Sequence, residues 1–294
     1  MKRNSITLTI VANMTANYGE GLGNIGSIQK VFKNKKVYAI RSRESIKNAI
    51  MMQSGLYDDL QTEVDGATQK LVNEEVNVSN CRALEGGYMS TKGITYIRKS
   101  SFYITDAIAC DSFVNETRFH NNLHLASNYA KNHNMNVQND AGKIGLMPYQ
   151  YEYDKTYKVY SMTIDLDMIG KDDNFAENEA SNVEKADRVI GLLDAVENLS
   201  LVVRGNLDNA EPIFVVGGFS PRKTHYFENV VKVENENLKL SEDLKLKLKE
   251  GFAAGLLQGG AFANEEEVIR TLQPVGTKAF FENLAMEVKA YYQV

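Results

Sequence analysis

The sequence predicts an α+β fold whose elements run strand, helix, strand, strand, helix, strand, with a long insertion after the first helix. Residues 5–13 and 157–166 alternate apolar and polar side chains, as strands with one buried face do. Residues 183–198 repeat apolar side chains at helical spacing. This order is the ferredoxin-like arrangement used by RNA-recognition domains, although alternating strands and helices would equally suit a parallel α/β sheet.

The N-terminal strand is followed by a glycine-rich loop, a short strand and a helix. Four glycines occupy eight positions in 19–26, and residues 37–40 predict the short strand. Residues 43–54 predict the helix, with Ser42 as its N-cap and Gly55 as the residue that stops it.

The middle of the chain carries weaker patterns. Residues 56–100 are rich in Asn, Gly and acids and end in a predicted strand at 93–97, and residues 101–110 predict another strand or its edge. Residues 111–150 are polar and amide-rich. A stretch of about 40 residues without strong periodicity is commonly functional or mobile.

The C-terminal part again alternates strands and helices. Strands are predicted at 199–204 and 212–219, and helices at 242–257, 265–271 and 277–292.

The composition is that of an ordinary globular protein. The 294 residues suffice for one large core or two modest ones, and 43% are apolar and 24% charged. The longest apolar strand candidates have about eight residues, far fewer than the roughly 20 that a transmembrane helix needs. Cys81 and Cys110 lie far apart with no pairing pattern, which excludes a disulfide framework and favours a reducing compartment. We therefore expect a cytoplasmic protein.

The charge is concentrated at one end. The net charge is −5, but the first fifty residues carry nine Lys or Arg and only two acids. That segment is +7, so the other 244 residues carry −12. A basic end on an acidic body steers an anionic partner to one face, but on charge alone these lysines could equally be solvated surface.

Gly21-Leu-Gly-Asn-Ile-Gly26 matches the dinucleotide-binding motif G-x-G-x-x-G literally. That motif needs its first glycine at the end of a strand, where a helix N-terminus receives the pyrophosphate. Here about seven residues separate Asn13 from Gly21, and 27–36 is too short for a crossover helix. We therefore disfavour a dinucleotide cradle. The chain contains no P-loop motif.

Two residue spacings could suggest a metal site, but each gives only weak support for one. His120 and His124 have the i, i+4 spacing of a helical metal pair but lack the neighbouring glutamate of a zinc protease and a third ligand. Asp165 and Asp167 alternate on one predicted strand, where such residues are usually solvated. No catalytic triad has a local signature. The sequence predicts no catalytic centre and no cofactor.

The basic helix start is the strongest candidate site. Arg43, Lys47 and Asn48 fall on one helical face, and Arg41 and Ser42 stand at its beginning. Free backbone N–H groups and the helix dipole favour phosphate there. This patch predicts a backbone-phosphate site that needs no base specificity.

The glycine-rich loop before the helix extends this candidate site. Asn17 and Gly19 belong to a segment where the backbone could approach a nucleic acid closely. The ring of Tyr18 could stack on a base.

Six stretches together resemble the DevR/Cst2-like CRISPR-associated proteins, which are RAMP-type backbone subunits of type I-B Cascade and belong to the seventh Cas family. They are Leu8-Thr-Ile-Val-Ala-Asn13, Asn17-Tyr-Gly-Glu-Gly-Leu-Gly-Asn-Ile-Gly26, Ile40-Arg-Ser-Arg-Glu-Ser-Ile-Lys47, Ser101-Phe-Tyr-Ile-Thr-Asp-Ala-Ile108, Phe119-His-Asn-Asn and Glu211-Pro-Ile-Phe-Val-Val-Gly-Gly218.

The resemblance implies a modified RNA-recognition palm formed by the single domain 1–294. It also implies a fingers-like insertion at 56–100 and a thumb-like insertion at 108–150. Copies of the protein would line up along CRISPR RNA in a helical filament beside other Cascade subunits, without a membrane. The guide RNA would then be held for pairing with the target DNA strand.

The resemblance also assigns residues. Ser42, Arg43 and Lys47 match the guide-contacting helix start, whereas Arg41 and Asn48 join them by geometry only. Two further sets are implied, a second glycine-rich edge near the RNA and the apolar wedges of the thumb: Gly217, Gly218 and Arg222 for the first, and Phe113, Phe119 and Met147 for the second.

Two features depart from the family pattern. Glu44 stands within the basic helix start, where capping of the helix would explain it. Related type III subunits cut target RNA with an aspartate of the first loop, but loop 14–26 contains only Glu20. We therefore expect that the protein has no catalytic activity of its own. The alternatives are a metal-dependent ribonuclease using Glu20 or the aspartates at 165 and 167 and, less favoured, a dinucleotide-binding oxidoreductase.

Overall fold

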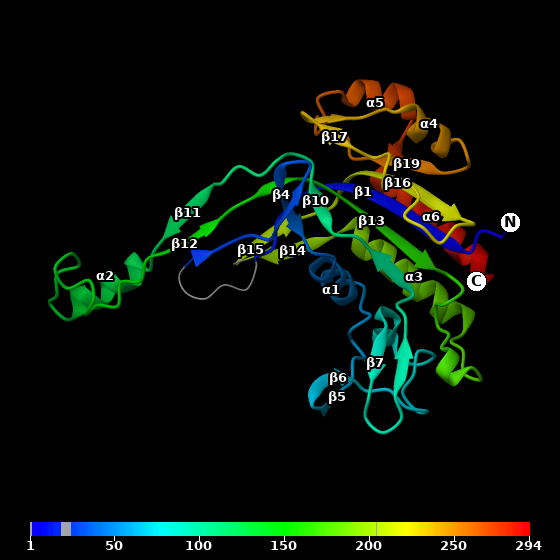
Figure 1. The fold of residues 1–294 in the computed structure, drawn as a ribbon, viewed down its shortest axis with the longest axis horizontal. Coiled ribbons are helices and arrows are strands. Elements are labelled where there is room, and N and C mark those ends of the chain that lie inside the picture. The colour runs from blue at the N-terminus through cyan, green and yellow to red at the C-terminus, as the bar shows by residue number, and fades with distance from the viewer. Residues whose placement is uncertain (1, 19–24, 204) are drawn as a thin grey trace.

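A nine-stranded mixed sheet forms the centre of the molecule (Figure 1). The computed structural model describes residues 2–18, 25–203 and 205–294. The strand order is β20-β19-β16-β1-β13-β10-β4-β3, and β9 pairs with β13. The strands are β1 (Ser5–Thr15), β3 (Lys30–Lys33), β4 (Lys36–Arg41), β9 (Phe102–Ile104), β10 (Ala107–Ala109), β13 (Lys155–Asp165), β16 (Pro212–Ser220), β19 (Ala253–Leu256) and β20 (Val275–Gly276).

β1 lies in the middle of this sheet because both of its edges are paired. It runs antiparallel to β13 over its whole length and antiparallel to β16 from Ser5 to Ala12. β19 and β20 form a parallel pair, which makes the sheet mixed. The strands predicted at 5–13, 157–166 and 212–219 are confirmed, and so is the α+β class.

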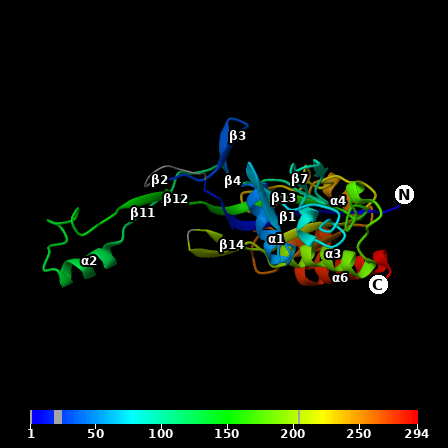
Figure 2. The same ribbon diagram turned by 90° about the horizontal axis from the view of Figure 1, so that it is seen from below.

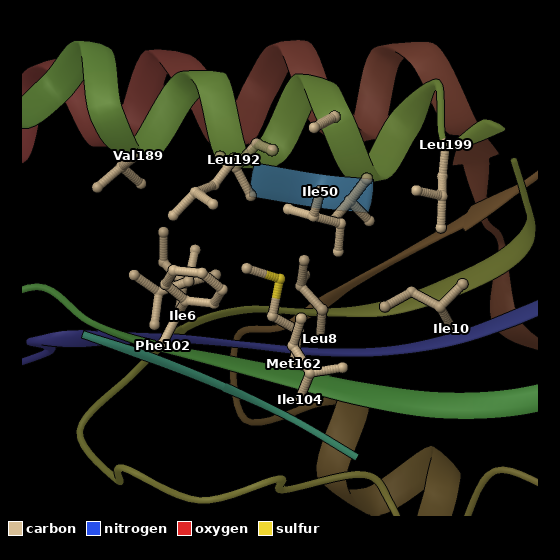
Figure 3. Packing of buried hydrophobic residues seen from close by; sticks show 14 of the residues in the cluster. Ile6, Leu8, Ile10, Ile50, Phe102, Ile104, Met162, Val189, Leu192 and Leu199 are labelled. Carbon is tan, nitrogen blue, oxygen red and sulfur yellow. The ribbon is translucent and has the colours of Figure 1, made fainter. Parts of the chain in front are cut away.

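Three helices cover one face of the sheet (Figure 2): α1 (Arg43–Gln53), α3 (Asn182–Glu197) and α6 (Thr277–Tyr292). Ile6, Leu8 and Ile10 of β1 point toward these helices and meet Ile50 of α1 and Leu192 of α3 (Figure 3). Burial stabilises the fold by about 1.5–3 kcal/mol for each such side chain, so the alternation along β1 decides which face receives the helices. All three helices were predicted.

The opposite face is partly covered by the segment that follows β16. Val11 and Phe214 of the sheet pack there against Phe227 and Phe262. The elements of this segment are β17 (Val233–Glu234), β18 (Asn237–Leu238), α4 (Glu242–Leu248) and α5 (Glu265–Leu272). The helix predicted at 242–257 is wrong in its second half. Gly251, at φ +92°, breaks the helical path, and β19 then pairs with β16 instead.

The predicted insertion at 56–100 forms a small lobe below α1 in Figure 1. Val78, Leu84 and Phe175 belong to its own apolar cluster. The side chain of Glu85 is fully buried and ion-pairs with Arg188 of α3, at 2.9 Å. The elements are β5 (Thr62–Asp65), β6 (Ala67–Lys70), η1 (Arg82–Gly86), β7 (Tyr88–Ser90) and β8 (Tyr96–Arg98), and η2 (Asp173–Phe175) packs beside them.

Residues 111–154 form an arm that projects from the sheet in both ribbon views (Figures 1 and 2). Its stem pairs β11 (Thr117–His120) with β12 (Tyr149–Glu152), and β2 (Ile25–Gly26) joins β12 in parallel. Its tip holds α2 (Leu123–Asn132), which packs Ala126 and Ala130 against Ile144. These elements are too short to produce strong periodicity in the sequence.

A hairpin of β14 (Ser200–Val203) and β15 (Asn206–Asn209) completes the fold. Asp208 ties it to the end of β1 because its Oδ2 accepts the backbone N–H of Thr15, at 2.7 Å. Over the ranges that the structure describes, no helix is both long and apolar enough to cross a membrane.

Candidate nucleic-acid interface

A groove of about 780 Å³ lies along the sheet face opposite the three helices. Ile108 and Ser161 belong to its floor, the tip of the β3–β4 hairpin forms one wall, and residues 228–234 form the other. Three cations and three carboxylates line it, so the groove is not basic in itself: Lys33, Arg43 and Lys232, and Asp106, Glu228 and Glu234. The excess positive charge lies on the exposed hairpin, which adds Lys35 and Lys36.

Three backbone N–H groups at the start of α1, those of residues 42, 43 and 45, already have hydrogen-bond partners. The Oδ1 atom of Asn17 accepts the N–H of Ser42 at 2.8 Å, and Oδ1 of Asp106 accepts the N–H of Arg43 at 2.7 Å. Ser42 Oγ caps the helix by accepting the N–H of Ser45 at 3.3 Å, as predicted for the N-cap. The N–H groups of Ser42, Arg43 and Ser45 are therefore not free to receive a phosphate, contrary to the expectation, and the side chains become the main candidates for phosphate contact.

Arg43 is the most accessible of the predicted contacts. Its side chain is 64% exposed, lines the groove and forms a surface ion pair with Glu44 at 2.8 Å. Such exposed pairs contribute about 0–1 kcal/mol, so a phosphate can displace Glu44 at little cost. The capping role expected for Glu44 is wrong, because its carboxylate binds Arg43 and Asn17 takes the N-cap amide.

The ammonium of Lys47 does not lie on the exposed surface beside Arg43, because it is hydrogen-bonded to the lobe at 56–100. Its ammonium donates to the carbonyl of Gly86 at 2.7 Å and to Ser100 Oγ at 3.0 Å. Burial lowers the pKa of Lys47 to about 8. The predicted convergence of Lys47 with Arg43 on one phosphate patch is not seen in this structure, because the lobe at 56–100 holds the ammonium of Lys47. Asn48 is exposed, and its Nδ2 lies 3.6 Å from Met52 Sδ.

Arg41 is buried, and two of its three guanidinium nitrogens have no hydrogen-bond partner among the described residues. The residue is 6% exposed, and its Nε and Nη1 donors have no acceptor among the described residues. Burial lowers the pKa of the guanidinium, and the charge of Asp208 opposes that shift. Arg41 pairs with Ala107, so its side chain points to the helix-covered face, and Ile108 points to the groove. Unsatisfied buried donors are uncommon and costly, which makes Arg41 a candidate ligand for an anion.

The loop that precedes the basic hairpin meets the arm at Tyr18. Its hydroxyl donates to the carbonyl of Glu152 at 2.9 Å, and its ring lies edge-on to that of Tyr151 at 5.8 Å. Gly19, the other loop position predicted to contact RNA, lies outside the described residues.

The predicted second glycine-rich edge lies in and after β16, several strands away from the groove in the strand order. β16 is separated from β10 by β1 and β13, so Gly217, Gly218 and Arg222 do not join the groove. Gly217 is buried, and a Cβ there would stand 1.9 Å from the carbonyl oxygen of Thr7. Gly217 is needed for close strand packing, and its predicted place near the RNA stays a prediction. Arg222 ion-pairs with Glu250 at 3.2 Å.

The three predicted wedges do not stand together. Phe113 is partly buried against the cluster that contains Ala39, and the ammonium of Lys30 lies 4.7 Å from its ring centroid. Phe113 therefore packs partly against the sheet, and its wedge role stays a prediction. Phe119 and Met147 lie on the arm and are 66% and 57% exposed, and their wedge role stays a prediction.

A family model of the CRISPR-associated negative auto-regulator DevR/Csa2 matches residues 51–235. The chain belongs to this family. The resemblance described above is thereby confirmed at the level of the family.

This DevR/Csa2 family member also has the fold of two solved chains. A chain of a CRISPR RNA-guided surveillance complex in a pre-nicking form is 10% identical, with a TM-score of 0.64 over 97% of this chain and 100% of that chain. A chain of a second CRISPR RNA-guided surveillance complex is 11% identical, with a TM-score of 0.58 over 96% of this chain and 99% of that chain. No curated protein matches significantly.

The structure gives the alternative sites of this DevR/Csa2 family member no support. His120 ends β11 and His124 lies in α2, so their i, i+4 spacing does not place them on one helix. Asp165 and Asp167 instead hold the ammonium of Lys223, at 2.8 and 3.3 Å. Within 2–18, 25–203 and 205–294, no three His, Cys, Asp or Glu gather as a metal site.

The dinucleotide motif falls largely on residues that the structure does not describe. Glu20, Gly21 and Gly23 lie outside the described residues. From Ile25 onward the chain forms β2, β3 and β4 before it reaches a helix. A crossover helix directly after the glycines, which the dinucleotide fold requires, does not follow.

Proposed function

We propose that this chain is a non-catalytic backbone subunit of a type I-B Cascade surveillance complex. It binds CRISPR RNA, oligomerises along the guide in a helical filament and holds the guide for pairing with target DNA in antiviral defence. Membership of the DevR/Csa2 family and a fold shared with chains of RNA-guided surveillance complexes support this function.

The strand order supports an RNA-recognition type of palm. The order across this part of the sheet is β16, β1, β13 and then β9 and β10, which both pair with β13. All these neighbours are antiparallel, and α1 and α3 cover one face. This is the order of the ferredoxin-like motif. We assign the palm to this unit, the fingers to the lobe at 56–100 and the thumb to the arm within 108–150.

The observation that carries the proposal is the buried guanidinium of Arg41. Two of its donors lack partners, and Arg43 and the hairpin lysines lie exposed in the same stretch of chain. An RNA phosphate would satisfy a guanidinium with charge-assisted hydrogen bonds. The exposed lysines of the β3–β4 hairpin would attract the RNA backbone without regard to its sequence.

The test is the affinity of the full chain for single-stranded RNA as a function of salt. We expect Arg41→Ala with Arg43→Ala to weaken binding at least about tenfold and to reduce the salt slope, since each lost phosphate contact removes about one unit of it. The matched control is Arg270→Ala, at an exposed arginine of α5. Unchanged affinity and slope in the double variant would refute the site.

The absence of catalysis is tested on the assembled complex with complementary RNA and divalent metal ions. We expect the RNA to stay intact. Cuts at regular intervals would identify a ribonuclease, and Asp165→Asn with Asp167→Asn would show whether those carboxylates produce them. Tight binding of a dinucleotide without RNA would favour the oxidoreductase.

A further inference from the structure

The side chain of Lys30 contacts both chains of the arm at its base. Its ammonium lies 2.5 Å from Glu152 Oε2, on the returning strand β12, and 4.7 Å from the ring centroid of Phe113, on the outgoing chain. The side chains of Lys30 and Glu152 are only 27% and 16% exposed, so salt screens this ion pair less than a surface pair. Because Lys30 begins β3, the pair joins the β3–β4 hairpin to the base of the arm.

Glu152 also holds the segment that carries β2. Its Oε2 accepts the N–H of Ile28 at 3.0 Å, and its backbone carbonyl accepts the hydroxyl of Tyr18 at 2.9 Å. The pairing of β2 with β12 involves only Ile25 and Gly26 on the β2 side. Since so short a ladder supplies few hydrogen bonds, the carboxylate of Glu152 is an important tie between this segment and the arm stem.

A second anchor lies two residues further along the chain, at Asp154. The fully buried ammonium of Lys158 donates to Asp154 Oδ2, to the carbonyl of Met14 at 2.9 Å and to Thr156 Oγ1 at 3.0 Å. Each of its three hydrogens therefore has an acceptor. The carbonyl of Asp154 in turn accepts the N–H of Ala16 at 3.1 Å. This cluster fixes the end of the arm to the end of β1.

Two anchors on one extended strand define a direction. Residues 152 and 154 are about 7 Å apart along such a strand, and residue 152 is the farther from the sheet. An anchor at Asp154 alone would leave the arm able to pivot, and the contacts of Glu152 oppose that motion. Lys30 therefore spends its charge inside the protein, whereas Lys33, Lys35 and Lys36 of the same hairpin are exposed.

We propose that Lys30 and Glu152 are positioning residues that fix the direction of the arm relative to residues 41–43, the candidate phosphate site. This inference rests on the proposed function, in which copies of the chain line up along one RNA. A fixed arm direction gives every copy the same geometry toward its neighbour. Lys30 thus acts through Glu152 and not by contacting RNA, although it belongs to the basic N-terminal segment.

The experiment measures the distance between a spin label on the arm and one on α1 in the full chain. The labels are attached to Asn128→Cys in α2 and Met52→Cys in α1, both exposed, after Cys81 and Cys110 are replaced by Ala. Double electron–electron resonance should give one narrow distance distribution for this labelled chain. Any broad distribution before further substitution would overturn the proposal.

In this labelled chain we expect Glu152→Ala to widen the distribution about twofold or more, because fewer contacts then hold the arm. Glu152→Gln keeps an acceptor for the N–H of Ile28 and should widen it less. Lys30→Met should match Glu152→Gln, and the two together should add little, since both remove the same ion pair. The control is Glu116→Ala, on the outgoing chain, whose side chain is 65% exposed and which should change nothing.

An unchanged width in Glu152→Ala would overturn the positioning role, and so would equal widening in Glu116→Ala or additive widening by Lys30→Met and Glu152→Gln. Circular dichroism of each variant verifies that the chain is folded. On RNA long enough for several copies, Glu152→Ala should bind with less cooperativity than the original chain, and unchanged cooperativity would refute the link to alignment. If the original chain binds no RNA, the proposed function fails, while the label distances still test the arm.

Discussion

At the scale of single residues, two buried arginines of this chain contrast sharply. Arg188 is 1% exposed and has carboxylates of Glu85 and Glu184 at 2.9 and 2.8 Å. Arg41 is 6% exposed and has two donors with no acceptor among the described residues. Removing one partner of a buried ion pair leaves the other charge uncompensated, whereas a buried cation without a partner already costs free energy in the folded state. The difference separates a structural arginine from a candidate ligand-binding one.

We therefore expect Arg41→Met to leave the free energy of unfolding unchanged or to raise it. The same change at Arg188 should lower it by about 3 kcal/mol, because Glu85 would lose a buried partner. Urea denaturation of both variants measures this. A large loss of stability in Arg41→Met would show that Asp208 makes Arg41 a structural cation.

Lys47 gives the protein a pH-dependent stability. Burial lowers its pKa in the folded state to about 8, whereas an unfolded lysine titrates near about 10.4. The unfolded chain therefore binds more protons between these values, and stability should rise with pH across this window. Urea unfolding from about pH 7.5 to about pH 9.5 should show a steeper rise in the original chain than in Lys47→Met.

The control for this pH dependence is Lys278→Met, whose side chain is 81% exposed and which should keep the original slope. Lys70, whose pKa burial and the charge of Lys47 lower to about 8, remains in both variants, and its pKa should rise in Lys47→Met, which reduces the slope of that variant further. Identical slopes in Lys47→Met and the original chain would contradict the assignment to Lys47.

At the scale of elements, the close pairing of β1 and β16 depends on Gly217. A Cβ at this position would stand 1.9 Å from the Thr7 carbonyl oxygen, so Gly217→Ala must push the strands apart. We expect a loss of about 3 kcal/mol or more in the free energy of unfolding, since overpacking here moves backbone. Gly259→Ala, where nothing lies within 4 Å, should change stability by less than about 0.5 kcal/mol.

The elements that could be predicted from the sequence were the long periodic ones. β1, β13, α3 and α6 repeat their apolar side chains over enough residues to determine their type. β19 was mistaken for helix because its pairing with β16 decides its conformation. The region at 111–150, expected as a thumb-like insertion, was given no strands or helices, although Tyr149-Gln-Tyr-Glu-Tyr153 alternates as a strand does.

The candidate site was predictable only in part. The position of the basic segment and the N-cap Ser42 follow from local sequence. The orientation of Lys47 does not, because its acceptor at Gly86 lies 39 residues away in the lobe. The second wall of the groove, at 228–234, is more distant still. Contacts of this kind depend on tertiary packing, which one sequence does not reveal.

At the scale of the whole molecule, the lobe at 56–100 is joined to the central unit by buried charge. Glu85 is fully buried, ion-pairs with Arg98 and Arg188, and accepts the N–H of Gly170 at 2.7 Å. These partners come from β8, α3 and the loop after β13. The lobe is therefore fixed to the central unit by buried ionic contacts, and we expect the two to unfold together.

We expect Glu85→Ala to lower the free energy of unfolding of the whole chain by about 3–5 kcal/mol, because it leaves buried arginines without a counter-charge. Lobe and sheet should still unfold together, giving one transition by circular dichroism and by tyrosine fluorescence. The control is Glu44→Ala, whose ion pair is exposed. Two separate transitions in the original chain would show that the lobe folds independently.

The arm leaves the sheet after β10 and returns at β13, and these strands are hydrogen-bonded neighbours. The N–H of Cys110 donates to the carbonyl of Tyr157 at 2.8 Å, so both ends of the arm meet at one hydrogen bond. A change in the arm's length therefore leaves the register of the sheet untouched. In evolutionary terms the arm is a module. Its reach can diverge between lineages, or be redesigned, without rebuilding the core that carries it.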